Sequence, residues 1–284
     1  MKTTPRPVIA PADTTDLARR IRQRALRMVS EAKAAHVGSA LSIADIVAVL
    51  YGGTLQVDPA QPRWPGRDRF ILSKGHACVA VYAALAETGF FPRSVLEGYC
   101  ADGSHLMAHI SHHVPGVEFS TGALGQGLPF GVGKALAALR SGEDWRTFVL
   151  MSDGELGEGS NWEAFLFAAH HQLDRLTAIV DYNKLQSLGT VAETLGIEPL
   201  GDKLRAFGWA VREVDGHDHG ALAEALSADR WALGRPQFLI AHTTKGKGVS
   251  FMEDKVEWHY RSPSPELLAE ALAALEATRE NSDA

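Results

Sequence analysis

The sequence has few cysteines, no long apolar run and no basic cluster, and each absence excludes a class of protein. Its two cysteines, Cys78 and Cys100, give neither a zinc-binding spacing nor a disulfide framework. No apolar run approaches the ~20 residues of a membrane-spanning helix. The first residues, Met1–Pro11, are polar and Pro-rich and lack the apolar core of a signal peptide. The net charge is −6 and no Lys/Arg run stands out, which disfavours a nucleic-acid partner. We therefore expect a cytoplasmic protein that binds neither membranes nor nucleic acid.

Helical and strand-like patterns alternate along the 284 residues, of which 45% are hydrophobic. This is ample for one large domain, and two are possible. Such alternation predicts an α/β fold with a mostly parallel sheet and helices on both faces. The helical patterns cover Asp16–Ala32, Ser42–Tyr51, His76–Glu87, Gly125–Leu139, Ser160–His171, Gly220–Leu226 and Glu266–Arg279. The strand-like runs are Arg69–Leu72, Thr147–Met151, Thr177–Val180, Ala210–Val214 and Gln237–His242.

Two polar segments, Ser152–Glu155 and Asp181–Leu185, each follow a short apolar run, and the helical pattern Ser160–His171 lies between them. This order predicts a β-α-β unit whose strands are parallel. Asp153 and Asn183 then project from the carboxyl ends of neighbouring strands. Open α/β sheets bind ligands in the crevice at those ends. The sequence therefore predicts a ligand site at this edge of the sheet.

The side chains of Asp153 and Asn183, with the carbonyl of Leu185, are hard oxygen donors of the kind that Mg²⁺ or Ca²⁺ prefers. A divalent ion there needs an anionic partner, for which a diphosphate is the best fit. The spacing, 183 − 153 = 30 residues, resembles the metal–diphosphate motif of thiamine-diphosphate enzymes, written GDG…N. Ser152 stands in place of the first glycine. The alternative interpretation is a surface Asp-Gly turn and an unrelated asparagine.

Four histidines lie in loops rather than on helix faces: His36, His76, His109 and His259. Any one alone is more often a surface or packing residue. Together, beside a diphosphate-type motif, they indicate a polar pocket for a hydroxylated, anionic substrate, because imidazole donates or accepts protons near neutral pH. The Gly-rich segment Ser120–Gly127 lets backbone approach a ligand closely, although tight helix packing explains it equally well.

With these motifs in this order, the chain resembles the N-terminal half of transketolase, and most of all the separately encoded N-terminal subunit of split transketolases. The resemblance runs from about Arg19 to His259. The matching segments are His36–Ser39, Leu41–Ile46, Arg67–Ala77, Pro115–Gly127, Asp153–Glu155, Glu158–Gly159, Asn183 and Lys245–Gly248.

The resemblance implies thiamine diphosphate and Mg²⁺ (or Ca²⁺) as cofactors. It places Asp153, Asn183 and the Leu185 carbonyl on the metal. Gly122 would offer its carbonyl to the 4′-amino group of the cofactor, and Leu124 would pack on the thiazolium. The implied cofactor-binding residues are His76, Gly122, Leu124, Asp153, Gly154, Glu155, Asn183, Lys245 and His259.

The resemblance also implies four catalytic residues: His36, His109, Glu158 and His259. His36 and His109 would hydrogen-bond the hydroxyls and oxyanion of the ketose intermediate. Glu158 would lie at the subunit contact, in the proton network between paired active sites. The family usually has Gly-His-Pro around the second histidine, where this chain has Ala-His-Ile at 108–110, and three further histidines lie nearby: His105, His112 and His113.

In the family, a second domain supplies the glutamate that protonates the pyrimidine of the cofactor. After His259 only 284 − 259 = 25 residues remain, too few for that domain. We therefore expect a partner polypeptide with the pyrimidine-binding domain, paired with this chain in a two-fold heterotetramer. The expected boundaries are residues 1–15 for an N-terminal extension, 16–262 for the diphosphate-binding domain and 263–284 for a C-terminal helix and tail.

The expected reaction is transfer of a two-carbon ketol unit from a ketose, or ketose phosphate, to an aldose, by an enzyme that is active only with its partner. Two alternatives stay open. The chain could be the α subunit of a 2-oxo acid dehydrogenase, which the histidines disfavour because those reactions do not handle polyhydroxylated substrates. It could also be a non-catalytic binding or regulatory subunit that has kept the pocket.

Overall fold

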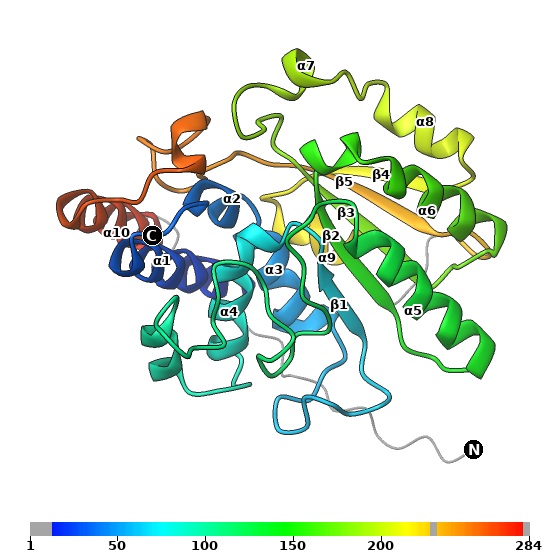
Figure 1. Cartoon of the computed structure of the whole chain (residues 1–284), viewed down its shortest axis with the longest axis horizontal. Helices are drawn as coiled ribbons and strands as arrows, with labels where there is room; N and C mark the ends of the chain where they lie inside the picture. Colours follow the sequence, from blue (N-terminus) through cyan, green and yellow to red (C-terminus); the bar gives the residue numbers. More distant parts are fainter. Residues whose placement is uncertain (1–12, 228–231, 281–284) are drawn as a thin grey trace.

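A five-stranded, fully parallel sheet forms the centre of the molecule (Figure 1). The structure is a computed structural model that describes residues 13–227 and 232–280. The strands are β1 (Arg69–Leu72), β2 (Thr147–Ser152), β3 (Leu176–Tyr182), β4 (Ala210–Asp215) and β5 (Gln237–His242), in the order β1-β2-β3-β5-β4. The α/β prediction with a mostly parallel sheet is confirmed. Most of the expected N-terminal extension, residues 1–12, lies outside the described residues, as do residues 281–284 of the tail.

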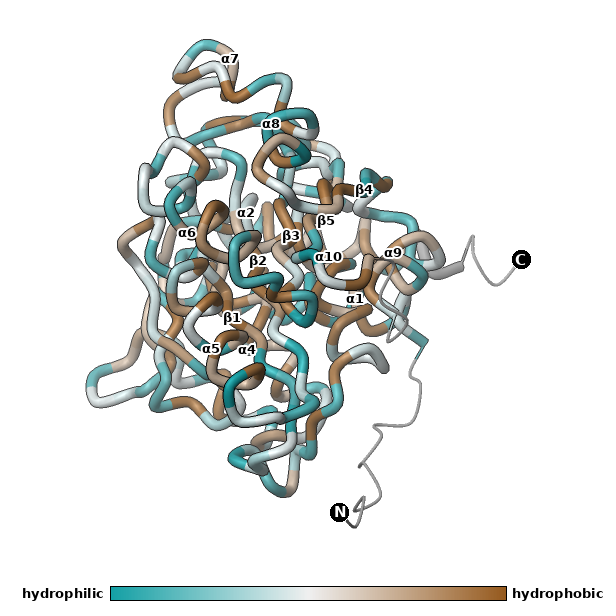
Figure 2. The backbone as a smooth tube through the Cα atoms, turned by 90° about the vertical axis from the view of Figure 1, so that its right-hand side faces the viewer, coloured by the Kyte–Doolittle hydropathy of each residue, from teal (hydrophilic) through white to brown (hydrophobic). Residues whose placement is uncertain are grey.

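Successive strand residues point to opposite faces of the sheet, and this alternation creates two hydrophobic cores. In β1, Phe70 and Leu72 join one core, whereas Ile71 joins the other. In β2, Leu150 belongs to the first of these cores and Val149 to the second. Figure 2 shows hydrophobic positions concentrated along the strands and the helices that cover them. Both faces are therefore buried, as the continuous apolar strand runs require.

Helices cover each face of the sheet (Figure 1). The first core holds α1 (Thr14–Ala32), α2 (Val37–Ser42), α3 (Ala44–Val49), α4 (Cys78–Glu87), α9 (His219–Ala225) and α10 (Pro265–Glu280). The second core holds α5 (Gly127–Ser141), α6 (Gly159–His170) and α8 (Leu200–Ala206), and the short α7 (Val191–Thr194) lies in the connection after β3. Among the described residues, no helix is long and apolar enough to cross a membrane.

The expected helix over 42–51 is wrong in its boundaries. The chain forms α2, breaks at Ile43, and continues as α3 and a π-helical turn, Leu50–Thr54. Ser42 closes α2 because its hydroxyl bonds Ser39 O at 3.0 Å and the buried carboxylate of Asp181 at 2.7 Å. Ser42, which bonds a buried carboxylate at the ligand edge of the sheet, thus interrupts a sequence pattern that is typical of a single helix.

The structure also differs from the expected helix boundaries at other positions. The expected helix from His76 begins as a 3₁₀ turn, Gly75–Ala77, before α4. The expected helix from Gly125 begins at Gly127, because Gly125 has φ +80°, outside the helical region. Further 3₁₀ turns span Arg93–Gly98, Gly154–Gly157 and Val256–His259. The short helices α7 and α8 lie in a stretch where the sequence predicts no helix.

Candidate active site

The carboxyl ends of β2, β3 and β5 bring the predicted ligand-binding residues together. Asp153 directly follows β2, and Asn183 directly follows β3. In the register, Ser152 pairs with Asp181, and Tyr182 pairs with His242 of β5. The segment after β5 then carries Lys245 to the same edge. The polar residues therefore meet at the edge of the sheet where the β-α-β interpretation of the sequence placed them.

Asp153 is a buried carboxylate whose hydrogen bonds come from backbone N–H groups. It is 1% exposed and accepts from Lys184 N at 2.6 Å and from Gly154 N at 2.7 Å. Burial and the nearby Asp181 carboxylate raise the pKa of Asp153 to about 7. No lysine, arginine or histidine of the described chain forms an ion pair with it. A bound cation would therefore compensate the buried charge of this carboxylate.

The amide of Asn183 is oriented by a buried ion pair behind it. Lys74 Nζ lies 2.5 Å from Asp181 Oδ2, and both side chains are at most 1% exposed. Asn183 Nδ2 donates to that same oxygen at 2.8 Å. A carboxylate that is held ionised by a lysine only accepts, so the amide nitrogen must face Asp181 and the amide oxygen must face away. The Asn183 oxygen accepts from Leu185 N at 3.0 Å and stands on the ligand side.

Lys245 reaches the carbonyls that follow Asn183. Its ammonium donates to Leu185 O at 3.1 Å and Gln186 O at 3.0 Å, and it lies 3.1 Å from His259 Nδ1. The residue is 1% exposed. Burial and the positive charge of Lys74 lower the pKa of Lys245 to about 8. The site therefore pairs a cation with the loop that carries the predicted metal-binding carbonyl.

All four predicted histidines converge. The ring of His36 is 5.1 Å from that of His76, 5.8 Å from that of His109 and 4.9 Å from that of His259. Its backbone explains the position: His36 has φ 74°, a left-handed conformation that is uncommon for a side-chain-bearing residue, and its N–H donates to His259 O at 2.8 Å. Strained backbone of this kind concentrates at functional sites.

Three of these imidazoles are held neutral. Burial lowers the pKa of His36 to about 4 and the pKa of His259 to about 3, with further lowering by nearby charges that include Lys245. Burial and Lys74 hold the pKa of His76 well below its usual range. Each neutral ring has one N–H donor and one acceptor nitrogen, so the cluster offers hydrogen bonds to hydroxyl groups of a ligand.

Residues outside the predicted set fix the segment around His109. Tyr82 of α4 donates to His109 O at 3.1 Å and accepts from Ser111 N at 3.1 Å, and Ile110 N donates to Gly75 O at 3.1 Å. No sequence pattern pointed to Tyr82, because it lies in a uniformly apolar helix. Three further histidines lie near this segment and outside the cluster: the ring of His113 is 5.3 Å from that of His105 and 4.2 Å from that of His112, whereas His109 contacts His36.

The Gly-rich segment passes close to the turn that carries His76. A Cβ on Gly75 would lie 2.4 Å from Thr121 O, so no larger residue fits there. A Cβ on Gly122 would lie 3.6 Å from the ring of His109, which places Gly122 beside the cluster. Gly122 is exposed and Leu124 is half-buried. Close approach of backbone therefore requires the glycine at 75, whereas Gly122 lies beside His109 with room for a small side chain.

Glu155, which the resemblance placed on the cofactor, is fully buried and bonded to the protein. Its carboxylate accepts from Ser73 Oγ at 2.5 Å, from Gly125 N at 2.8 Å and from Ser152 N at 3.4 Å. It therefore connects the loops of the site. Ser152, in place of the family's glycine, turns its hydroxyl to Glu155 N at 3.3 Å and caps the following 3₁₀ turn.

Glu158 lies apart from the histidine cluster, at the start of α6, and is exposed. The apolar side chains of Leu166 and Phe167, on the same helix, are 58% and 43% exposed. Leu195 is 54% exposed and lies 3.5 Å from the position of a Cβ on Gly157. Exposed large apolar side chains on one helix are typical of a surface that another chain covers.

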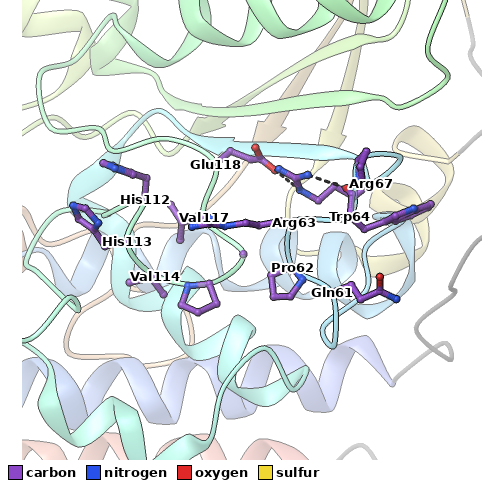
Figure 3. Close-up of a pocket in the computed structure, with 13 residues that line it drawn as sticks. Gln61, Pro62, Arg63, Trp64, Arg67, His112, His113, Val114, Val117 and Glu118 are labelled. Carbon is purple, nitrogen blue, oxygen red and sulfur yellow. Dashed lines mark hydrogen bonds and ion pairs between the residues drawn. The ribbon is translucent and has the colours of Figure 1, made fainter.

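A large hollow elsewhere does not include the predicted site residues. A cavity of about 770 Å³ lies beside the segment that leads into β1, lined by residues 61–65, 67 and 112–118 (Figure 3). Arg67 and Glu118 form an ion pair at 2.6 Å on its wall. His112 is fixed at its edge by Ser120 Oγ, 2.7 Å from Nδ1. The chemistry gathered at the carboxyl ends of the strands thus lies outside this hollow.

Residues 13–269 match the family described as "Transketolase, thiamine diphosphate binding domain". The chain belongs to the transketolase family. One subunit of the apulose-4-phosphate transketolase of Phocaeicola vulgatus is 42% identical, over 88% of this chain and 89% of that protein. A 6-deoxy-6-sulfo-D-fructose transketolase subunit of a Clostridium species is 40% identical, over 90% of this chain and 94% of that protein. These transketolase relatives are themselves subunits, so the prediction of a split transketolase's N-terminal subunit is confirmed.

Solved transketolases share the fold. The enzyme of Campylobacter jejuni gives a TM-score of 0.88 at 30% identity, and that of Leishmania mexicana gives 0.86 at 33% identity. This chain covers 42% and 41% of those proteins. The transketolase chain is thus a transferase subunit and not a member of the 2-oxo acid dehydrogenase class that stayed open from the sequence. The family description supports thiamine diphosphate as the cofactor.

Proposed function

We propose that this chain supplies the diphosphate-binding half of a two-component transketolase whose sites handle ketose phosphates or related anionic ketoses. The observation that carries the proposal is the joining of two predicted groups: four converging histidines and the oxygen donors at the ends of β2 and β3. The first group suits a polyhydroxylated substrate, and the second suits a metal-bound diphosphate. A cytoplasmic setting stays a prediction.

The residues present fit thiamine diphosphate with Mg²⁺ or Ca²⁺. The buried Asp153 carboxylate has a raised pKa and lies beside an outward-facing amide oxygen of Asn183. The carbonyl of Leu185 is the third donor. Three hard oxygens with one negative charge would suit a divalent ion that accompanies a diphosphate. When bound, the cofactor supplies the nucleophilic carbon on which two-carbon transfer depends.

The chain's own residues then orient and hydrogen-bond the reactants. Lys245 offers a buried ammonium, which offsets the charge of a diphosphate. The ring of His259 lies 3.1 Å from this ammonium at Nδ1 and 5.7 Å from the ring of His76, which suits contacts of both histidines to the diphosphate and the substrate. Neutral His36, and His109 beside it, donate to hydroxyl and carbonyl oxygens of a ketose. Preorganised donors of this kind stabilise developing negative charge.

Glu155 acts by positioning. Because its oxygens already bond Ser73, Gly125 and Ser152, it fixes the loops that frame the site. Gly122 and Leu124 lie on one of those loops, with Gly122 exposed beside His109. These two residues would contact the cofactor if it were bound between two chains, through the exposed Gly122 and the half-buried Leu124. Gly154 follows the metal-binding carboxylate, where its N–H bonds Asp153.

The partner covers the exposed surface around α6. Glu158, Leu166, Phe167 and Leu195 give this surface one carboxylate and three large apolar groups. The partner supplies the pyrimidine-binding domain and its glutamate, and Glu158 faces a carboxylate of a second chain. Two copies of each chain give closed two-fold symmetry, which is the common solution. Such obligate interfaces bury more than ~2,000 Å².

The substrates follow from the site and from the relatives. The relatives' names specify apulose 4-phosphate and 6-deoxy-6-sulfo-D-fructose, both ketoses with an anionic end. The converging, hydrogen-bonding histidines suit the hydroxylated end of such a donor. The anionic end then extends toward the partner, away from the buried cluster.

Carbon-labelled donor ketoses test the proposal. The co-purified pair of chains is incubated with ketoses labelled at carbon 1, such as fructose 6-phosphate, and with an aldose acceptor. We expect the label to appear in a product two carbons longer than the acceptor, only when thiamine diphosphate and Mg²⁺ are present. A pair that binds thiamine diphosphate but transfers no label from any anionic ketose would contradict the proposal.

A further inference from the structure

The segment 243–246, which directly follows β5, holds Lys245 in place through separate anchors. Thr243 Oγ1 donates to the buried carboxylate of Asp181. Thr244 N donates to His217 Nε2 at 2.8 Å. Gly246 N donates to Gly38 O at 3.0 Å, in the segment after His36. Of these anchors, only His217 comes from the edge of the sheet at β4, outside the predicted site.

The hydrogen bonds of His217 define its protonation. Its Nδ1 lies 2.6 Å from Asp45 Oδ2, and its Nε2 accepts from Thr244 N. Because an ionised carboxylate only accepts, Nδ1 must carry the proton. Because Nε2 accepts an amide hydrogen, it must be unprotonated. His217 is therefore a neutral imidazole with both nitrogens used, and 13% of its side chain is exposed.

Asp45 is in turn fixed by a buried network. Arg22 binds it with two nitrogens, at 2.9 and 2.5 Å, and His219 Nε2 lies 3.1 Å from it. Burial opposes its ionisation, but Arg22 and the two histidines outweigh burial and hold the pKa of Asp45 well below its usual range. The network extends from α1 through α3 to the turn after β4, which is a rigid frame for His217.

The turn after β4 and the turn after β5 pack closely against each other. Gly216 N donates to His242 O at 2.7 Å. A Cβ on Gly216 would lie 2.5 Å from Thr243 Cγ2 and 3.0 Å from His242 O, so a side chain there would displace the turn that leads to Lys245. The hydrogen bond from Thr244 is therefore one part of a continuous contact between the turn after β4 and the turn after β5.

We propose that His217 is a positioning residue for the cofactor site: it holds the Thr244 amide and thereby sets the place of the Lys245 ammonium against the carbonyl of Leu185 and the ring of His259. The inference rests on the proposed function, because that function gives Lys245 its role. His219 shares the Asp45 carboxylate, but its other ring nitrogen bonds Thr14 Oγ1 rather than the Lys245 turn. The two histidines therefore form a matched pair for an experiment.

The test compares His217→Asn with His219→Ala, each co-purified with the partner chain. Asparagine places an amide nitrogen where Nδ1 stands, so it keeps the bond to Asp45, but it is too short to reach Thr244. Two quantities are measured: the affinity for thiamine diphosphate with Mg²⁺, by calorimetry, and the hydrogen-exchange rate of the amides at 243–246 without cofactor. Thermal unfolding of both variants is recorded alongside.

We expect His217→Asn to weaken cofactor binding about tenfold, equivalent to ~1.4 kcal/mol, and to speed exchange at Thr244. His219→Ala should stay within about twofold of wild type in both measurements. Cofactor affinity within twofold of wild type for His217→Asn, or an equal loss in His219→Ala, would overturn the proposal.

Failure of the proposed function has a different signature. If the proposed function is wrong, the wild-type pair does not bind thiamine diphosphate. The hydrogen-exchange rate of the Thr244 amide still shows in that case whether His217 holds this amide. If His217→Asn does not assemble, exchange of the wild-type Thr244 amide decides: a rate equal to that of an unstructured peptide would overturn the proposal.

Discussion

The buried ion pair between Lys74 and Asp181 should be essential to the stability of the ligand edge. Asp181 is fully buried and receives four donors: Lys74, Ser42, Asn183 and Thr243. Replacing Lys74 by Met removes the only charge-compensating group among these donors and keeps a side chain of similar length. The three remaining donors are neutral, so the buried carboxylate loses its ion-pair partner.

The burial of this ion pair sets the expected loss in the free energy of unfolding. Removing one partner of a buried ion pair costs about 3–5 kcal/mol, because the other charge stays desolvated. Burial opposes ionisation of Asp181, but Lys74 is the main group that counters burial, and the pKa of Asp181 lies below its usual value. We therefore expect the removal of the Lys74 ammonium to cost about 3–5 kcal/mol, that is, the full cost of breaking a buried ion pair. In Lys74→Met/Asp181→Asn, the charge is gone and the amide still accepts hydrogen bonds. We expect the double variant to recover about half of the loss.

Urea unfolding of the co-purified pair, at one fixed protein concentration, measures these differences. Arg205→Met is the control, because Arg205 and Asp202 form an ion pair whose side chains are 50% and 74% exposed. The control should change the free energy of unfolding by less than about 1 kcal/mol. A loss below about 1 kcal/mol for Lys74→Met, or a double variant less stable than the single one, would show that Lys74 does not compensate the buried charge of Asp181.

Three further predictions concern individual groups. Asp153→Asn should weaken binding of thiamine diphosphate with Mg²⁺ roughly a hundredfold or more in calorimetry, since a ligand and its charge are lost together; unchanged affinity would remove the metal assignment. His109→Ala should lower turnover by about 2–4 kcal/mol in transition-state stabilisation and leave cofactor affinity intact; wild-type kinetics would shift its role to a neighbouring histidine. The pKa of His36 falls from 6.5 to about 4 on folding, so the unfolded chain binds more protons in that range and stability is lost as the pH drops through it. His36→Gln should therefore reduce the fall in unfolding midpoint between pH 7 and pH 5, and an unchanged pH dependence would contradict the neutral assignment.

The sequence predicted the sheet and the main residues of the site, for physical reasons that can be named. Each strand is an apolar run bounded by polar turns, and polar residues that follow parallel strands must meet at one edge. Asp153 and Asn183 therefore lie at the same edge of the sheet. The family resemblance brought His36 and His259 to the same edge, and the structure confirms that their rings lie 4.9 Å apart.

Other features depend on contacts between distant segments, which no local pattern shows. Tyr82 lies in a helix whose nine buried residues give it no distinguishing signal, yet its hydroxyl fixes the backbone around His109. His217 meets Thr244 across 27 residues of sequence. Glu155 was predicted to bind the cofactor, and its hydrogen bonds to three protein groups became visible only with the loops in place. The roles assigned to the site residues stay predictions until they are tested by substitution.

The central claim is that the transketolase chain is half of a catalytic unit. The most direct test is a titration: the chain, purified without companions, receives increasing amounts of its partner with thiamine diphosphate, Mg²⁺ and a sugar-phosphate pair present. We predict no turnover at the start, then activity that rises in proportion and saturates at one partner per chain. Robust turnover by the lone chain would contradict the account, because the glutamate that activates the cofactor would then have to come from the 284 residues themselves.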